Sequence, residues 1–437
     1  MIRFSLGILC AALMIGCSPL SKSSLNKKLK SMDEQLKDHT GFMLYDLEKK
    51  EAVFEYNSSK YFTPASNTKI FTLFASLKIL GDSVPALHYR ETTDSLIFWG
   101  TGDPSFLYKY VYNNGRTYNF LKHAQKPLYF SSANFYSAHY GPGWSWDDYN
   151  DYYSAERSAF PLYGNIFSVK LENGSPKAYP SYFRQYFAFG PDKERTGVIR
   201  ELQSNHFTFH WGKRRSSATV WDVPIRMEGG LTVMLLCDTL KKPIAVLDKH
   251  PFDSTKLSEI KTFYSIPTDS LYKVLMQESD NFIAEQLLMM CSDVINPDST
   301  QTQIAINYVK KNFLKDLKDA PSWVDGSGLS RYNLFTPRTI VQMWEKIYQL
   351  RPRERLFPLL ATGGVNGTIK NWYKGENGPY IFGKTGSLSN VHCLSGYLVT
   401  RSGKTLIFSF MNNNFVESTS KVRTHMHELL KMIHEKY

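Results

Sequence analysis

Pro64-Ala65-Ser66-Asn67-Thr68-Lys69-Ile70-Phe71-Thr72 is the stretch on which the interpretation of this chain depends. The run that follows is apolar up to Leu80 and stops at Gly81, which predicts a helix beginning near Ser66. Side chains three residues apart lie one helical turn apart, so Ser66 and Lys69 should face each other. A lysine in that position can take the serine's proton if burial or a neighbouring cation keeps its amine neutral.

The spacing by itself is weak evidence, because it also occurs from Ser24 to Lys27 and from Ser418 to Lys421. An ordinary helix cap followed by a solvated lysine would produce the same letters. The catalytic interpretation therefore needs partners elsewhere in the chain.

Two further motifs supply those partners, in a fixed order along the sequence. They are Ser279-Asp280-Asn281 and Lys384-Thr385-Gly386-Ser387, which give the series S-x-x-K, S-D-N and K-T-G. Ser132-Ala133-Asn134 also fits S-x-N, but it lies in a region predicted to be rich in strands, with no helix behind it. We therefore favour Ser279.

Each residue of the series suits one step of acyl transfer. Ser66 is the candidate nucleophile and Lys69 its base. The hydroxyl of Ser279 can relay a proton to a leaving amine, and the amide of Asn281 can hold a substrate's backbone.

The K-T-G motif suits the other end of a substrate. Lys384 and Thr385 offer a positive charge and a hydroxyl to a carboxylate, and Lys384 should also help to keep Lys69 neutral. Gly386 would let a substrate lie along the strand edge. The backbone N–H groups of Ser66 and Ser387 could form an oxyanion hole.

With these motifs the chain resembles the penicillin-binding protein and serine β-lactamase superfamily. More closely, it is similar to the D-alanyl-D-alanine carboxypeptidase/endopeptidase family of low-molecular-mass penicillin-binding proteins, the peptidase S13 type. The resemblance runs from about residue 40 to the C-terminus. It includes further motifs at residues 102–105, 142–148, 325–331 and 364–368. Residues 175–225 match no family pattern, and Ser387 stands where the family often has threonine.

The resemblance implies a serine carboxypeptidase or endopeptidase that acts on peptidoglycan stem peptides through a Ser66 acyl-enzyme and is inhibited by β-lactams. Two alternatives remain open. A serine β-lactamase would need a dedicated deacylating base, for which Tyr112-Asn113-Asn114 and Tyr163-Gly164-Asn165 are weak candidates. A cell-wall-binding lipoprotein without catalysis is the other alternative.

The first residues predict export. A short basic start precedes an apolar run from Phe4 to Ile15 that is too short to span a bilayer. The following Gly16-Cys17 resembles a bacterial lipoprotein signal, with a lipid on Cys17. An ordinary secretory signal is the alternative. Either way we expect the cell envelope or periplasm, with membrane attachment through Cys17.

Composition excludes little. The 437 residues carry a formal net charge of +12 without long basic blocks, so no nucleic-acid partner is expected. Cys237, Cys291 and Cys393 have no metal-like spacing, and we expect core residues, with no essential disulfide, metal or cofactor. The aromatic-dense run from Tyr140 to Tyr153 either binds a sugar or peptide or fills a core or interface.

The predicted fold is α+β, with an antiparallel sheet flanked by helices. We expect a signal peptide at 1–16, a lipid-anchored tether at 17–32, a catalytic domain at 33–81 and 266–437, and a β-rich insertion at 82–265. Strands are predicted at 41–47, 52–56, 96–100, 207–211, 231–235, 380–386, 394–400 and 405–411. Helices are predicted at 66–80, 268–293 with a break at 279–281, 301–313, 337–348 and 418–436.

Overall fold

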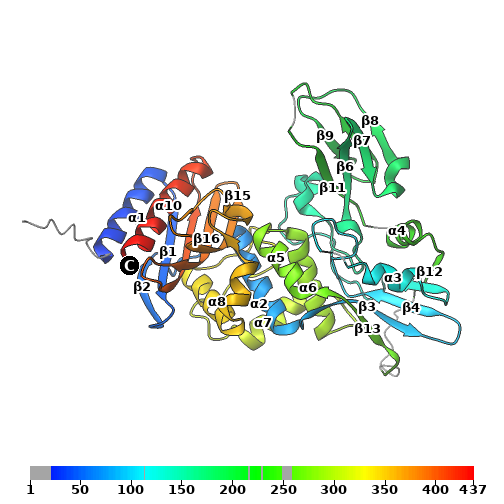
Figure 1. Ribbon diagram of the computed structural model, residues 1–437, viewed down its shortest axis with the longest axis horizontal. Coiled ribbons are helices and arrows are strands. Elements are labelled where there is room, and N and C mark those ends of the chain that lie inside the picture. The colour runs from blue at the N-terminus through cyan, green and yellow to red at the C-terminus, as the bar shows by residue number, and fades with distance from the viewer. Residues whose placement is uncertain (1–20, 113, 215–216, 228–229, 249–257) are drawn as a thin grey trace, which may run out of the picture.

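A computed structural model describes residues 21–112, 114–214, 217–227, 230–248 and 258–437. The molecule is elongated. The sheet formed by the two ends of the chain lies at one end, a group of helices lies in the middle, and residues 83–267 extend from the other side (Figure 1). The predicted signal sequence and Cys17 lie outside the described residues. Within the described ranges, no helix has the length and apolar character needed to cross a bilayer.

A six-stranded antiparallel sheet is the frame for the three motifs. Its order is β14-β15-β16-β17-β1-β2, so strands from both ends of the chain are neighbours. The strands are β1 (His39–Asp46), β2 (Glu51–Tyr56), β14 (Ala361–Thr362), β15 (Ile381–Leu388), β16 (Val391–Val399) and β17 (Thr405–Asn413). The predicted hairpin and the three predicted C-terminal strands are confirmed, and the fold is α+β as expected.

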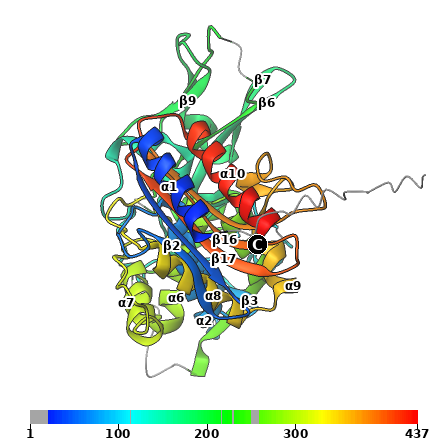
Figure 2. The same ribbon diagram turned by 90° about the vertical axis from the view of Figure 1, so that its left-hand side faces the viewer.

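Both faces of this sheet are buried, because successive side chains of a strand point to opposite sides. In β1, Phe42 and Leu44 enter the core beneath helices α1 (Lys22–Leu36) and α10 (Thr419–Lys436). Met43, between them, enters the core shared with α2 (Lys69–Ile79) and α8 (Pro337–Leu350). Figure 2 shows α1 and α10 side by side across the outer face.

Helix α1 corrects the predicted tether. Residues 22–32 belong to a helix that packs on the sheet, and only residues 17–20 of the predicted tether lie outside the described part. Leu25, Leu29, Met32 and Leu36 are buried at helical spacing, which makes one face apolar in an otherwise Ser/Lys-rich segment. The polar composition concealed this spacing.

Residues 83–267 form three smaller sheets. One is five-stranded, with the order β12-β5-β4-β3-β13, and β13 returns antiparallel beside β3. Two three-stranded sheets have the orders β8-β10-β9 and β11-β6-β7. The strands are β3 (Ser83–Glu91), β4 (Leu96–Gly100), β5 (Leu128–Ser131), β6 (Ile166–Glu172), β7 (Ser175–Tyr179), β8 (Phe187–Phe189), β9 (Gly197–Arg200), β10 (Phe207–His210), β11 (Val220–Pro224), β12 (Ile244–Val246) and β13 (Lys261–Pro267).

The described part of this region also holds two α-helices, α3 (Arg116–Lys122) and α4 (Leu231–Leu240). The strand predicted at 231–235 is therefore wrong, whereas those at 96–100 and 207–211 are confirmed as β4 and β10. A short apolar run does not by itself distinguish a buried strand from a buried helix. Leu231, Leu235 and Leu236 are buried on one side of α4.

The central helices follow the prediction closely. They are α5 (Thr268–Gln277), α6 (Asn281–Ile295), α7 (Thr302–Phe313), α8 and the single turn α9 (Arg353–Leu356). The predicted break at 279–281 is confirmed. Ser279 has a φ of 64°, which is not helical, and a new helix begins after it, where the side chain of Asp280 caps α6 by accepting from the Ile283 N–H at 2.8 Å. Cys291 and Cys393 are buried, and Cys237 is half-buried.

Candidate active site

A cavity of about 330 Å³ brings the three motifs together. Ser66, Asn281 and Ser387 all line it, although they come from three distant parts of the chain. Ser66 lies in a 3-10 turn, Ala65–Thr68, directly before α2, so the predicted helix begins with one tighter turn. Asn281 is the first residue of α6, and Ser387 lies near the end of β15.

Lys69 is completely buried and faces Ser66. Its Nζ donates to Ser66 Oγ at 2.8 Å, to Asn281 Oδ1 at 2.6 Å and to the carbonyl oxygen of Ser327 at 2.6 Å. These three acceptors fix the amine beside the hydroxyl. The 2.8 Å contact lies in the range within which a base can remove a proton directly.

Burial lowers the pKa of Lys69 to about 8, since a charged amine loses its hydration inside the protein. The negative charges of Asp325, Asp280 and Glu285 act in the opposite direction and raise the pKa. Burial is thus the largest cause of the lowered Lys69 pKa, and it is one of the two causes considered from the sequence. The contribution expected from Lys384 stays a prediction, although the two lysines do interact, since Lys69 lowers the pKa of Lys384.

Ser279 belongs to the Lys384 side of the site. Lys384 Nζ donates to Ser279 Oγ at 2.7 Å and to the carbonyl oxygen of Thr385 at 2.7 Å. Burial, and then Lys69, lowers the pKa of Lys384 well below its usual range. A bound carboxylate would favour the protonated form again.

Asn281 has two partners in the structure. Its Oδ1 accepts from Lys69, and its Nδ2 donates to the carbonyl oxygen of Tyr153 at 3.0 Å. Its amide group carries two N–H bonds, so one is left for a substrate. Tyr153 comes from the 83–267 region and also lines the cavity, a contribution that no sequence motif revealed.

Thr385 and Ser387 are each held by a neighbouring side chain. The hydroxyls of Thr385 and Thr368 lie 2.7 Å apart, which gives the motif at residues 364–368 a positioning role. Ser387 Oγ lies 2.8 Å from Nδ1 of His392. Burial lowers the pKa of His392 to about 3, so this imidazole is neutral.

Gly386 is required for close packing against the Ser66 turn. A Cβ at this position would lie 2.4 Å from the carbonyl oxygen of Pro64 and 2.9 Å from the backbone nitrogen of Asn67. Next to it the strand edge is open for an extended substrate. Among the described strands, β14 pairs along this edge of β15 only at Phe382 and Gly383.

Replacing Gly386 by alanine is expected to lower the free energy of unfolding by about 1–3 kcal/mol, the usual cost of overpacking. The matched control is Gly197→Ala in β9, where a Cβ would meet nothing within 4 Å. That variant should stay within about 0.5 kcal/mol of the parent. Denaturant unfolding measures both. Equal stability of the two variants would contradict this account of Gly386.

A buried network that sequence reasoning missed holds the Ser327 carbonyl against Lys69. Glu285 Oε1 accepts from the N–H groups of Gly326 and Ser327 at 2.9 and 2.7 Å. Its other oxygen lies 2.7 Å from Nη2 of Arg157.

Asp325 forms a second buried centre next to Glu285. It accepts from the backbone N–H of Gly328 at 2.9 Å and from Trp144 Nε1 at 2.9 Å. Trp144 and Arg157 belong to the 83–267 region, so that region helps to build the site.

The outer part of the cavity carries one charge of each sign. Asp148 and Arg331 both line it, together with Gly143 and Ser145. Arg331 Nη2 also lies 3.3 Å from the carbonyl oxygen of Ser389. Both signs of charge are therefore present in the wall of the cavity that Ser66 lines.

The other candidates from the sequence lie elsewhere. Asn134 is buried and donates to the carbonyl oxygen of Gly100 at 2.9 Å, a structural role. Ser418 caps α10, and Lys421 pairs with Glu417. This pair is therefore an ordinary helix cap followed by a surface lysine. Asn165 is buried and bonds to the Glu156 carbonyl. Asn113 lies outside the described residues.

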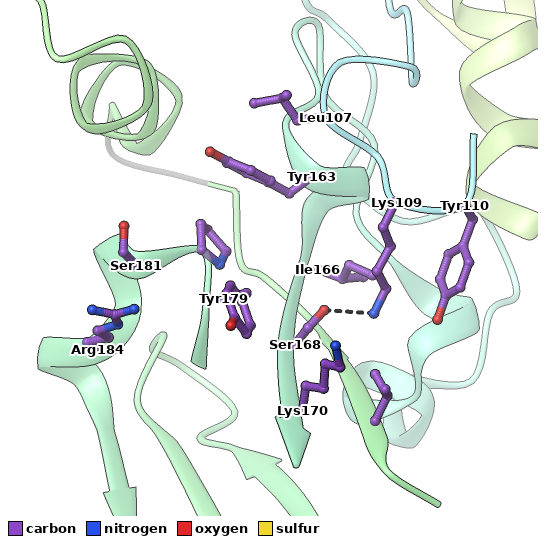
Figure 3. Close-up of a pocket in the computed structure, with 12 residues that line it drawn as sticks. Leu107, Lys109, Tyr110, Tyr163, Ile166, Ser168, Lys170, Tyr179, Ser181 and Arg184 are labelled. Atoms are coloured by element: carbon purple, nitrogen blue, oxygen red, sulfur yellow. Dashed lines mark hydrogen bonds between the residues drawn. The ribbon is translucent and has the colours of Figure 1, made fainter. Parts of the chain in front are cut away.

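A larger cavity of about 700 Å³ lies in the 83–267 region (Figure 3). Lys109, Lys170 and Arg184 line it together with tyrosine side chains, and Lys109 donates to Ser168 Oγ at 3.1 Å. It contains no residue of the three motifs. Among the described residues, no group of three or more His, Cys, Asp or Glu side chains is placed to hold a metal ion.

The model of the D-Ala-D-Ala carboxypeptidase 3 (S13) family matches residues 22–199 and 239–435. The match begins earlier than the resemblance seen in the sequence. It also includes residues 175–199, part of the stretch in which no family pattern was found. Residues 200–238 remain unmatched.

Curated relatives and solved structures agree with this match. D-alanyl-D-alanine carboxypeptidase DacB of Haemophilus influenzae is 24% identical, over 86% of this chain and 85% of the relative. Penicillin-sensitive carboxypeptidase A of Dictyostelium discoideum is 21% identical, over 83% and 80%. The crystal structure of penicillin binding protein 4 from Haemophilus influenzae superimposes with a TM-score of 0.75 at 21% identity, covering 95% of this chain and all of that one. This likeness confirms the predicted fold class.

Proposed function

Because this chain belongs to the D-Ala-D-Ala carboxypeptidase 3 (S13) family, we propose that it cleaves D-Ala-D-Ala ends of peptidoglycan stem peptides through an acyl-enzyme on Ser66. The observation that carries the proposal is the 2.8 Å contact between Ser66 Oγ and the buried amine of Lys69. The same chemistry would make β-lactams inhibitors. In support, a related Haemophilus influenzae structure with a TM-score of 0.67 is complexed with a β-lactam.

In the acylation step, Ser66 Oγ bonds to the carbonyl carbon of the penultimate residue while its proton passes to neutral Lys69. The peptide C–N bond then breaks, and the proton held by Lys69 is relayed to the leaving amine through the hydroxyl of Ser279, which leaves Lys69 neutral again. Water later attacks the ester carbon and gives a proton to Lys69, and that proton passes to Ser66 Oγ as the ester bond breaks. The backbone N–H groups of Ser66 and Ser387 would hold the oxyanion.

Substrate binding is assigned to the residues around the nucleophile. The terminal carboxylate would lie against Lys384 and Thr385, whose hydroxyl is oriented by Thr368. Asn281 would hold the peptide backbone with its remaining N–H. The open edge of β15 beside Gly386 and Ser387 would pair with the extended substrate.

The pH dependence of acylation should report Lys69. The base must be neutral, and its pKa is about 8, so at pH 7 only about one molecule in ten carries the active form. The acylation rate is therefore expected to rise about tenfold per pH unit below about pH 8 and to level off above it. Stopped-flow acylation by a chromogenic β-lactam measures this. A rise that continues to about pH 10 would indicate an ordinary lysine.

The balance between carboxypeptidase and endopeptidase activity can be measured by digesting purified sacculi with the enzyme and identifying the products by mass spectrometry. Loss of a single alanine indicates a carboxypeptidase, and conversion of dimers to monomers indicates an endopeptidase. Absence of both products, with no acylation by β-lactams, would overturn the proposal.

Export and anchoring are part of the proposal, because peptidoglycan lies outside the cytoplasmic membrane. The motif ending in Cys17 supports a lipid on that residue. Helix α1 begins at Lys22, so a lipid on Cys17 would leave only a few residues between the membrane and the folded protein.

A further inference from the structure

The loop of residues 140–149 has a cavity on each of two sides. Gly143 and Ser145 line the Ser66 cavity. A second cavity, of about 690 Å³, is lined from the same loop by Trp144, Ser145 and Trp146. Ser145 lines both, so the two cavities are neighbours on either side of this residue. Its volume is that of a typical small-molecule site.

Aromatic rings dominate this second cavity. Tyr140, Trp144, Trp146 and Tyr149 all line it, and Trp146 is 78% exposed. A single exposed aromatic side chain is common on a protein surface, but here Trp146 lies beside three further rings in the wall of one cavity. Flat apolar rings with a few polar groups at the rim suit a ligand that has an apolar face and hydrogen-bonding edges.

The polar side chains of the cavity already have partners within the protein. Glu156 accepts from the hydroxyl of Tyr140 at 2.9 Å and from the Met227 N–H at 2.8 Å. Arg226 donates to Gln203 at 2.5 Å. Since the carboxylate of Glu156 is already hydrogen-bonded and aromatic rings form much of the wall, the cavity suits a neutral ligand that has hydrogen-bonding edges. Sugar rings meet this description, because they have C–H faces that stack on aromatic rings and hydroxyl or amide edges.

The loop is held rigidly on its inner side. Trp144 donates to Asp325, and the guanidinium of Arg157 lies 5.2 Å from the Trp144 ring. A Cβ on Gly141 would lie 2.3 Å from Trp144 Nε1, so the chain packs tightly there. A fixed loop presents Trp146 without a large ordering cost on binding.

The direction of the proposed substrate leads to this cavity. With its carboxylate end at Lys384 and Thr385, its amino-terminal part would extend through the Ser66 cavity, whose wall includes Ser145. In peptidoglycan, that end of the stem peptide is attached to an N-acetylated disaccharide. Four extended residues between sugar and scissile bond span at most about 14 Å.

We propose that the aromatic cavity around Trp146 binds the N-acetylated disaccharide to which the reacting stem peptide is attached. This inference rests on the proposed function and extends it, because it makes the glycan a determinant of substrate selection. The enzyme then prefers a peptide still attached to its sugar over the same peptide alone.

The test compares two substrates that end in D-Ala-D-Ala. One is a free pentapeptide, and the other is the same peptide on N-acetylglucosaminyl-N-acetylmuramic acid. The readout is the ratio of their kcat/KM values for D-alanine release. Trp146→Ala is expected to lower this ratio about tenfold, the size of one good aromatic contact, and Trp146→Phe should restore most of it.

The control is Phe189→Ala in β8, another exposed aromatic residue, which lies outside the cavity and should leave the ratio unchanged. A parent enzyme without preference for the disaccharide overturns the inference, and so does a Trp146→Ala variant that loses both activities equally. In both cases the proposed function survives. If neither substrate is cleaved, the proposed function fails and the inference fails with it.

Discussion

Replacing Ser66 by alanine is expected to abolish D-alanine release and β-lactam acylation, with a fall in kcat of at least about 10⁴-fold. No other hydroxyl contacts the Lys69 amine among the residues that the structure describes. The loss of a serine nucleophile costs about 10⁶-fold in a well-studied serine protease, although that enzyme uses histidine as its base. Chromatographic assay of released D-alanine measures the effect.

The chain offers a matched control for this variant. Ser418 has the same spacing to a lysine, but it caps α10 by accepting from the Lys421 N–H at 3.3 Å. Ser418→Ala should cost about 1 kcal/mol of stability and leave turnover unchanged. Turnover that persists in Ser66→Ala, or that is lost in Ser418→Ala, would contradict the assignment.

Replacing Lys69 by methionine is expected to slow acylation by about 10²–10⁴-fold, the usual contribution of a positioned base. Methionine keeps the approximate length of the side chain but cannot accept a proton. Acylation by a fluorescent penicillin, followed over time, gives the rate. Substrate carboxylate binding by Lys384 should persist, so KM should change much less than kcat.

Arginine at position 69 and methionine at position 421 complete this experiment. Lys69→Arg should be as slow as the methionine variant, since arginine stays protonated. Lys421→Met removes a surface lysine paired with Glu417 and should acylate at the parent rate. An arginine variant that acylates normally would show that charge, and not proton transfer, is what position 69 supplies.

The order of three short motifs was enough to predict which residues would meet. Ser66 and Lys69 are local neighbours, so helical spacing alone places them together. Ser279-Asp280-Asn281 and Lys384-Thr385-Gly386 needed the family resemblance, because no periodicity in the sequence shows that α6 packs against α2 and β15 against the turn that carries Ser66. The break before α6 was visible because Asp280 is a typical helix cap.

The supporting network could not be predicted from such motifs. Glu285 and Arg157 are 128 positions apart, and neither belongs to a sequence motif that distinguishes it from the other charged residues of the chain. Only the fold shows that their buried pair holds the Ser327 carbonyl toward Lys69. The sequence left burial and a neighbouring cation open as causes of a lowered Lys69 pKa, and only the packing around α2 shows that burial is the larger one.

Two secondary-structure errors have physical explanations. The apolar positions of α1 are four or three residues apart, but they are separated by so many serines and lysines that the segment resembled a polar linker. In α4, the β-branched Thr232 and Val233 favoured a strand in a short window. Leu235, Leu236 and Leu240 pack into the apolar core of the 83–267 region, and this packing stabilises a helix.

The most direct test of the account is mass analysis of the intact protein after incubation with benzylpenicillin, followed by peptide mapping. The account predicts one stable adduct per chain, on the peptide that contains Ser66, and none in Ser66→Ala. An adduct on another residue, or no adduct in a folded parent protein, would contradict the claim that Ser66 is the acylated nucleophile.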